Sequence, residues 1–162
     1  MEKNNFQTLA DNRIEVAKRL AMDDELAKCL LNKDKNFKDT KVTPIEKGRL
    51  MHTQIYPYSK TTNTLTESKS YITMRFKYRK VRGANVFKTA SITIFAFCSD
   101  DLVETSYTTL RPDYMIQQID RLLNDTRSEG WVGKLSLESM EDVVFDRGYI
   151  GVSVTYANSE FQ

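Results

Sequence analysis

Histidine, cysteine and glycine are scarce in this sequence, and their scarcity excludes several kinds of active site. His52 is the only histidine, and Cys29 and Cys98 are isolated, with no further cysteine at metal-ligand spacing. The common zinc sites and serine–histidine nucleophiles need more of these residues, so we interpret His52 as a structural or surface histidine and both cysteines as buried free thiols. The six glycines are dispersed, which excludes a phosphate-binding loop and a dinucleotide fingerprint.

Long apolar segments are also missing. No run approaches the roughly 20 apolar residues that a membrane helix needs, and residues 1–10 lack the basic start and the apolar stretch of a secretion signal. We therefore expect a protein that is made in the cytoplasm and that does not contact a membrane.

Adjacent carboxylates are the remaining candidates for catalysis, because a pair can transfer protons or hold magnesium. Adjacent side chains at a helix start or turn usually point apart and act as caps or solvated charges. Each pair here has such a position, so we predict a non-enzyme with no cofactor and no metal. A hydrolytic or nucleotidyl enzyme is the alternative, which metal-dependent activity abolished by Asp100→Ala would support. The pairs are Asp23–Asp24, Asp100–Asp101 and Glu141–Asp142.

The length of the chain, 162 residues, suits a single domain with one core. Hydrophobic residues make up 40% and charged residues 28%, proportions that are typical of a globular protein rather than a disordered one. We therefore expect one domain over residues 1–162.

The first third of the chain is predicted to be mainly helical. Apolar residues recur at three- and four-residue steps from Asn5 to Met22, which is typical of an amphipathic helix. Asp23 then has the position of an N-cap for a second, short helix, with further acidic residues in its first turn. Lys33 to Lys47 is polar, rich in lysine and interrupted by Pro44, so we interpret it as a loop or arm that orders on contact with a partner.

A long β-hairpin is the clearest local pattern. Residues 70–81 alternate between apolar and basic side chains, residues 87–98 alternate again, and Arg82-Gly83-Ala84-Asn85 supplies the turn. Phe95 and Phe97 fall on the otherwise polar face, so we expect a helix or a neighbouring subunit to cover part of it. A short strand from Leu50 to Tyr58 and a loop tip from Ser59 to Thr66 precede the hairpin.

The remaining elements complete an α+β fold. Arg111-Pro112-Asp113 is expected to open a helix, because proline suits the first turn. Strands are predicted from Trp131 to Ser139 and from Tyr149 to Tyr156, with a polar turn between them that includes Glu141 and Asp142. The order of elements predicts a mostly antiparallel sheet with a long central hairpin, N-terminal helices and one later helix packed on one face.

Charge is segregated along the chain. Between Glu67 and Asp100 there are seven cations and no carboxylate, whereas residues 100–162 hold twelve acidic residues against five basic ones. The total remains +2. A nucleic-acid-binding protein would usually keep an uncompensated basic excess, while two patches of opposite sign also suit head-to-tail contact between identical copies.

A small nucleic-acid-binding module that uses the basic hairpin 69–88 is the alternative function. Cations on one side of a strand repeat at about 7 Å, a spacing that can follow phosphates. The aromatic residues Phe76 and Tyr78, however, fall on the face opposite to the cations and cannot stack bases beside phosphate contacts. Non-specific contact with DNA makes no such demand and stays open.

Short phrases along most of the chain resemble a known group of proteins. They are the Asp-Asp-Glu-Leu turn within Leu20 to Asn32, Ile55-Tyr56-Pro57 followed by Thr66-Glu67 and Tyr71-Ile72, the Arg111-Pro112-Asp113 helix ending Ile119-Asp120-Arg121-Leu122-Leu123, and Gly148-Tyr149-Ile150-Gly151. With the order of elements and the absence of a catalytic set, these phrases resemble the small neck proteins of tailed bacteriophages, above all the tail terminator and head-to-tail joining group.

The resemblance implies a small α+β domain whose copies form a ring, commonly a hexamer, that caps the tail tube and presents a surface to the head connector. The implied partners are copies of the chain, the tail tube protein and head connector or adaptor proteins, and the implied location is the tail or neck of the virion. Terminator, adaptor and stopper proteins share such compositions, so all three remain open.

Opposite charges fit a ring, because each copy then offers one patch to a different patch of the next copy. Two interpretations of the basic residues stay open, contact with the acidic residues of an adjacent copy and lining of a DNA channel. The basic residues are Arg75, Lys77, Arg79, Arg82 and Lys88, and the acidic ones are Glu138, Glu141, Asp142 and Asp146.

Overall fold

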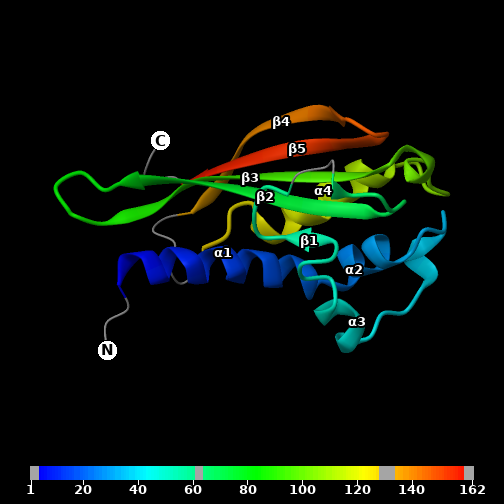
Figure 1. Ribbon diagram of the computed structural model, residues 1–162, viewed down its shortest axis with the longest axis horizontal. Helices are drawn as coiled ribbons and strands as arrows, with labels where there is room; N and C mark the ends of the chain where they lie inside the picture. Colours follow the sequence, from blue (N-terminus) through cyan, green and yellow to red (C-terminus); the bar gives the residue numbers. More distant parts are fainter. Residues whose placement is uncertain (1–3, 61–63, 128–133, 159–162) are drawn as a thin grey trace.

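A sheet with the strand order β1-β2-β3-β5-β4 occupies the centre of the molecule (Figure 1). The computed structural model describes residues 4–60, 64–127 and 134–158, and within them the sheet has five strands. β1 is parallel to β2, and every other neighbouring pair is antiparallel. The strands are β1 (Ile55–Tyr56), β2 (Ser70–Lys80), β3 (Phe87–Ser99), β4 (Leu135–Phe145) and β5 (Tyr149–Asn158).

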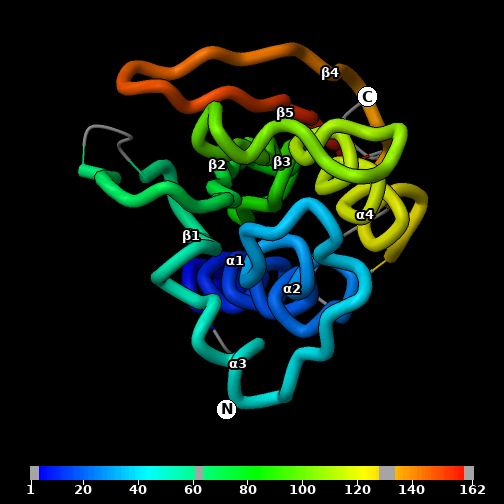
Figure 2. The backbone as a smooth tube through the Cα atoms, turned by 90° about the vertical axis from the view of Figure 1, so that its right-hand side faces the viewer, coloured from blue at the N-terminus to red at the C-terminus, as the bar shows by residue number. Residues whose placement is uncertain are grey.

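Helices cover one face of this sheet, as both views show (Figures 1 and 2). Ile72, Ile92 and Val154 of the sheet share a buried cluster with Leu20 of α1 and Ile119 of α4. The predicted α+β class, with one domain, a long central hairpin and helices on one face, is confirmed. The helices are α1 (Asn5–Ala21), α2 (Asp24–Leu31), α3 (Pro44–Gly48) and α4 (Arg111–Leu123), with short 3-10 turns η1 (Phe37–Asp39) and η3 (Asp100–Leu102).

Caps fix the start of the first two helices. The side chain of Asn4 accepts a hydrogen bond from the backbone N–H of Gln7, and that of Asp23 accepts one from Leu26 at 3.0 Å. Each cap satisfies a backbone donor that the helix itself leaves unpaired. The prediction that Asp23 caps a second helix is confirmed.

The lysine-rich segment from Lys33 to Lys47 contains structure that the sequence did not predict. Thr43 and Glu46 form a reciprocal capping box, and Pro44 begins the short helix α3 rather than interrupting a loop. Phe37 is fully buried, with its ring 5.0 Å from that of Tyr114. The interpretation as a loop or arm is therefore incomplete, because Phe37 anchors this segment in the core.

The strand predicted from Leu50 to Tyr58 is much shorter in the structure. The carbonyl of Leu50 accepts hydrogen bonds from the backbone N–H groups of Thr53, Gln54 and Ile55, so this stretch is a tight turn and only β1 is extended. His52 is exposed in that turn with a φ of 62°, and its ring stacks on Tyr58 at 6.2 Å. It is a surface histidine and does not begin a strand.

The hairpin of β2 and β3 follows the predicted alternation except at a bulge in β3, where Thr89 pairs with Tyr78 and is buried. Gly83 in its turn has a φ of 79°. Phe97 on the face away from the helices is buried in a second cluster with Tyr71 and Tyr149, against which Phe145 packs. Side chains of the sheet itself and Leu65 cover Phe97, and no helix does. Cover of the half-buried Phe95 by a neighbouring subunit stays a prediction. Residues 61–63 of the predicted loop tip lie outside the described residues.

β4 differs from its predicted extent at both ends. The predicted start at Trp131 lies outside the described residues, and the strand continues beyond Ser139 to Phe145. Glu141 and Asp142 pair with β5 inside the strand, so the prediction that they form a turn is wrong. The connection to β5 is instead the short segment 146–148, where Gly148 has a φ of 77°.

Arg111 at the start of α4 is fully buried, and no carboxylate of the described residues pairs with it. Its guanidinium group donates hydrogen bonds to backbone carbonyls and lies 4.7 Å from the ring centre of Phe37. These bonds hold the segment after α2 and the η3 turn against α4, since the accepting carbonyls belong to Leu102, Cys29, Asn32, Lys33 and Asp34.

Candidate assembly surfaces

The five predicted basic residues gather on the hairpin, and we refer to Arg75, Lys77, Arg79, Arg82 and Lys88 as the basic hairpin surface. The first three alternate along β2 on the outer face of the sheet, which is the face opposite to the helices. Arg82 is exposed in the turn, and Lys88 pairs directly with Arg79 across the hairpin. Like charges at directly opposite positions repel each other, so this surface favours a ligand of negative charge.

The cations of the hairpin are largely uncompensated within the described part of the chain. Lys77, Arg79 and Arg82 form no ion pair with the carboxylates there, and Arg75 lies over the ring of Phe95 at 5.7 Å. Exposed cations keep a strong long-range attraction for an oppositely charged partner, which salt weakens.

The predicted acidic residues lie on the last hairpin, and we refer to Glu138, Glu141, Asp142 and Asp146 as the acidic strand surface. The first three are exposed on β4, and Asp146 is exposed in the turn to β5. None of the four has an ion pair with a cation of the described residues. Within the described residues, Lys77, Arg79 and Arg82 of the basic surface and the four residues of the acidic surface therefore have no ion pair.

The structure does not bring the two surfaces together. β3 and β5 lie between β2 and β4, and β4 is at the edge of the sheet (Figure 2). Contact between the surfaces therefore requires a second copy of the chain, because a rigid sheet separates them within one copy.

Two aromatic side chains of the hairpin, Phe76 and Tyr78, lie on the side of the helices. The ring of Phe76 stacks on that of Tyr78 at 6.4 Å, and Arg13 of α1 lies 4.9 Å from the centre of Phe76 and donates a hydrogen bond to the Tyr78 hydroxyl at 2.9 Å. These rings are used in packing α1 against the sheet. On the outer face the ring of Phe95 lies beside the basic hairpin surface, but it is half-buried and Arg75 lies over it.

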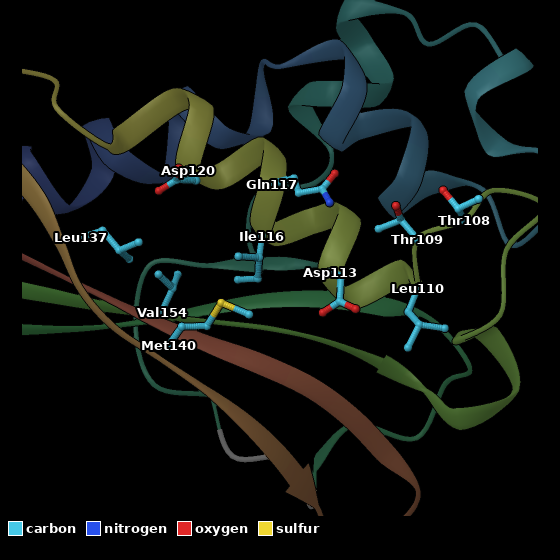
Figure 3. A pocket seen from close by; sticks show the side chains of 10 residues that line it. All are labelled: Thr108, Thr109, Leu110, Asp113, Ile116, Gln117, Asp120, Leu137, Met140 and Val154. Carbon is cyan, nitrogen blue, oxygen red and sulfur yellow. The ribbon is translucent and has the colours of Figure 1, made fainter.

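A groove of about 590 Å³ lies between α4 and the inner face of β4 (Figure 3). Ile116 and Val154 form its floor, and Leu137 and Met140 border it with 46% and 56% of their surface exposed. The groove exists because β4 extends beyond the helix that would cover it. Sequence reasoning missed it, since the alternation of a strand does not reveal where the opposing helix ends.

The polar groups of this groove serve structural roles. Asp120 accepts a hydrogen bond from the hydroxyl of Tyr156 at 2.9 Å, and burial together with this bond raises the pKa of Tyr156. Asp113 lies in the first turn of α4, where a negative charge interacts favourably with the helix dipole. The groove is a shallow apolar surface rather than an arrangement of reacting groups.

Three of the adjacent carboxylates, Asp23, Asp24 and Asp101, are engaged in local contacts. Asp23 pairs with Arg121 at 2.7 Å, and Asp24 pairs with Lys47. Asp101 accepts hydrogen bonds from the hydroxyl of Ser68, and hydrogen bonds from serines hold the pKa of Asp101 below its usual value.

Further features bear on chemistry in the described ranges 4–60, 64–127 and 134–158. Burial raises the pKa of Cys29 and of Cys98 to about 12, so neither thiol is a ready nucleophile at neutral pH. Within those ranges no three histidine, cysteine or acidic residues lie close enough to hold a metal ion. There is also no helix among them with the length and apolar character to span a membrane.

A model of the YomW family matches residues 23–158, which run from the cap of α2 to the last residue of β5. Helix α1 precedes the matched region. No curated protein and no solved structure matches the chain.

Proposed function

The chain belongs to the YomW family, whose name is that of a phage-like Bacillus prophage protein, and from this phage-related origin we propose that it is a structural protein of a virion. It assembles head to tail into a ring at the tail end or the head–tail junction. In this position it ends the growth of the tail tube and offers a surface for joining to the head.

The observation that carries the proposal is the separation of two surfaces of opposite charge across one sheet. The basic hairpin surface and the acidic strand surface lie on opposite sides of the pair β3 and β5. Identical copies that join through two different patches form a heterologous contact, which closes into a ring when the rotation between copies allows it.

The partners follow from this position in the particle. Each copy contacts two further copies, a commonly hexameric ring docks on the tail tube protein, and the opposite side of the ring meets a head connector or adaptor. The function needs no catalytic group, cofactor or metal, because its mechanism is docking and association. Terminator, adaptor and stopper roles all use such a ring.

Reversal of charge on the basic hairpin surface tests the proposal. In a phage that depends on this gene, replacing Arg75, Lys77 and Arg79 by glutamate should prevent ring formation, because two acidic surfaces then face each other. Electron microscopy should show heads and tails that are not joined, or tails of abnormal length.

A matched control carries three reversals elsewhere on the surface, Lys18→Glu, Lys41→Glu and Arg127→Glu, all at exposed positions. The control should give joined particles. Joined particles and intact rings from the Arg75, Lys77 and Arg79 variant would contradict the proposal.

A second candidate function is the binding of nucleic acid by the basic hairpin surface, favoured by its exposed cations at about 7 Å spacing along β2. In this case the protein should be retained on DNA in a strongly salt-dependent way. Glu141→Lys separates the two functions, because it should damage assembly but leave DNA retention unchanged or stronger.

A further inference from the structure

Two edges of the sheet are open over similar lengths. β1 pairs only with the start of β2, at Ile72 and Thr73, and the carbonyl of Tyr58 accepts the N–H of Met74. From Arg75 to Lys80 the described residues provide no strand beside β2 on that side.

β4 forms the other open edge. Its first residues are closed off by the segment after α4, where Leu135 exchanges backbone hydrogen bonds with Asp125 and Thr126, and the N–H of Leu137 bonds the side chain of Asn124. From Ser139 to Phe145, β4 has a partner only in β5 among the described residues.

The backbone of the β2 edge is ready to pair. The N–H groups of Ile72 and Met74 point away from β3, toward Gln54 and Tyr58. Because backbone groups alternate in direction along a strand, the N–H and C=O groups of Phe76, Tyr78 and Lys80 point to the same open side. An open row of this kind is a template for strand addition.

We propose that the open edge of β4 in one copy pairs antiparallel with the open edge of β2 in the next copy, so that the sheets of neighbouring copies join. This inference rests on the proposed assembly and names its contact. The β4 edge carries Glu138, Glu141 and Asp142, and the β2 edge carries Arg75, Lys77, Arg79 and Lys80.

The direction of the strands agrees with a head-to-tail contact. β2 is antiparallel to β3, β3 to β5, and β5 to β4, so β2 and β4 run in opposite directions. If neighbouring copies are related by a rotation about an axis parallel to the strands, every strand keeps its direction in the next copy. The β2 strand of the next copy is then antiparallel to β4 of the first copy.

Charge selects this contact over a symmetric dimer. A two-fold axis at the β4 edge would place the acidic strand surface against itself, and one at the β2 edge would place cations against cations. Like charges directly opposite each other in neighbouring strands are destabilising, whereas opposite charges stabilise the pair. Only the contact between the two different edges places opposite charges beside each other.

The faces of the two strands define a register. Directly paired residues of neighbouring strands share a face of the sheet. Glu141 pairs with Ser153, Ser153 with Phe95, and Phe95 with Thr73. Since Thr73 and Lys77 are an even number of residues apart on β2, Glu141 lies on the same outer face as Lys77. Setting Lys77 opposite Glu141 in an antiparallel pair also brings Lys80 near Glu138, the bulged residue of β4. On the inner face the same register covers the exposed Met140 with Tyr78 of the next copy.

Cysteine pairs test the contact directly. Directly opposite residues of antiparallel strands have Cβ atoms about 4.5–5.5 Å apart, close enough for a disulfide after a small adjustment. Under mild oxidation the variant Lys77→Cys with Glu141→Cys should give a ladder of covalent oligomers in purified protein and in phage particles. Each single variant should stay monomeric on a denaturing gel, and the buried Cys29 and Cys98 should not contribute.

A carbodiimide, which joins an amine to a carboxylate without a spacer, provides the second measurement on the unaltered chain. Mass spectrometry should find Lys77 linked to Glu141, or Lys80 linked to Glu138. Such a link must join two copies, because β3 and β5 separate these residues within one copy.

The control for the cysteine experiment is a Lys18→Cys and Glu104→Cys pair, at two exposed positions away from both edges. This variant should give no ladder of covalent oligomers.

Two results would overturn the strand contact. The first is the absence of both the ladder and the isopeptide links. If the ring then has its normal mass, the proposed assembly stands and only the edge contact fails. The second is efficient dimerisation of Glu141→Cys alone, which would indicate a symmetric contact. The assembly proposal is tested by joined or unjoined phage particles, whereas the strand contact is tested by crosslinks. Failure of one proposal can therefore be told apart from failure of the other.

Discussion

Replacement of Arg111 by alanine should lower the free energy of unfolding by about 3–5 kcal/mol, because several buried carbonyls lose their donor at a cost of about 1–3 kcal/mol each. The guanidinium group is fully buried and donates to carbonyls of three chain segments. Alanine would leave these carbonyls without a donor, and each unsatisfied buried group costs free energy. Denaturant unfolding followed by circular dichroism measures the loss.

Arg121→Ala is the matched control for this prediction. Arg121 lies on the same helix, half exposed, and pairs with Asp23, so its loss should cost about 1 kcal/mol or less. Arg111→Lys should resemble Arg111→Ala rather than the control, because an ammonium group cannot reproduce the planar fork of five donors. Equal losses for Arg111→Ala and Arg121→Ala would show that the buried network does not stabilise the fold.

Replacement of Gly151 by alanine should destabilise the protein by about 2–3 kcal/mol, near the upper end for an overpacked core. A Cβ atom at this position would lie 2.7 Å from the Cα of Phe97 and closer still to the carbonyl oxygen of Ala96. Phe97 cannot move away easily, because its ring packs 4.7 Å from that of Phe145. Glycine in this strand therefore permits the close approach of β3 and β5.

Gly48→Ala is the control for the glycine prediction. Gly48 is the last residue of α3, and a Cβ atom there meets nothing within 4 Å. Alanine favours helices by up to about 1 kcal/mol over glycine, so this variant should be as stable as the wild type or more stable. Thermal unfolding of both variants gives the comparison, and an unchanged midpoint for Gly151→Ala would contradict the packing argument.

Local patterns were sufficient to predict much of the fold. The start of α2 at Asp23 depends on side chains within one turn, and the alternation of residues 70–81 is a property of a single strand. For the same reason the faces of β2 were predicted correctly, including the basic outer face with Lys77, whereas the bulge at Thr89 in β3 was not. These features need no knowledge of distant residues.

Features that depend on distant partners were missed. Arg111 was interpreted only as part of a helix start, although its side chain organises segments that are far away in the sequence. The extension of β4 through Glu141 depends on pairing with β5. The sequence signal for this extension of β4 is weak, because a polar, acidic stretch in an edge strand has the composition of a turn.

The candidate surfaces were predicted in composition but not in arrangement. The sequence shows that cations and carboxylates are segregated, whereas only the strand order places them on opposite sides of the sheet. That order is not sequential, since β5 lies between β3 and β4. The open edges follow from this order and could not be inferred from alternation along the chain.

The mass of the protein in solution, measured by light scattering at low and at high salt, tests most directly whether opposite charges drive assembly. The account predicts an oligomer of several chains of 18.8 kDa at low salt, and a smaller mass at high salt because salt screens exposed charges. The mass of a single chain at low salt, or an oligomer that salt does not affect, would contradict it.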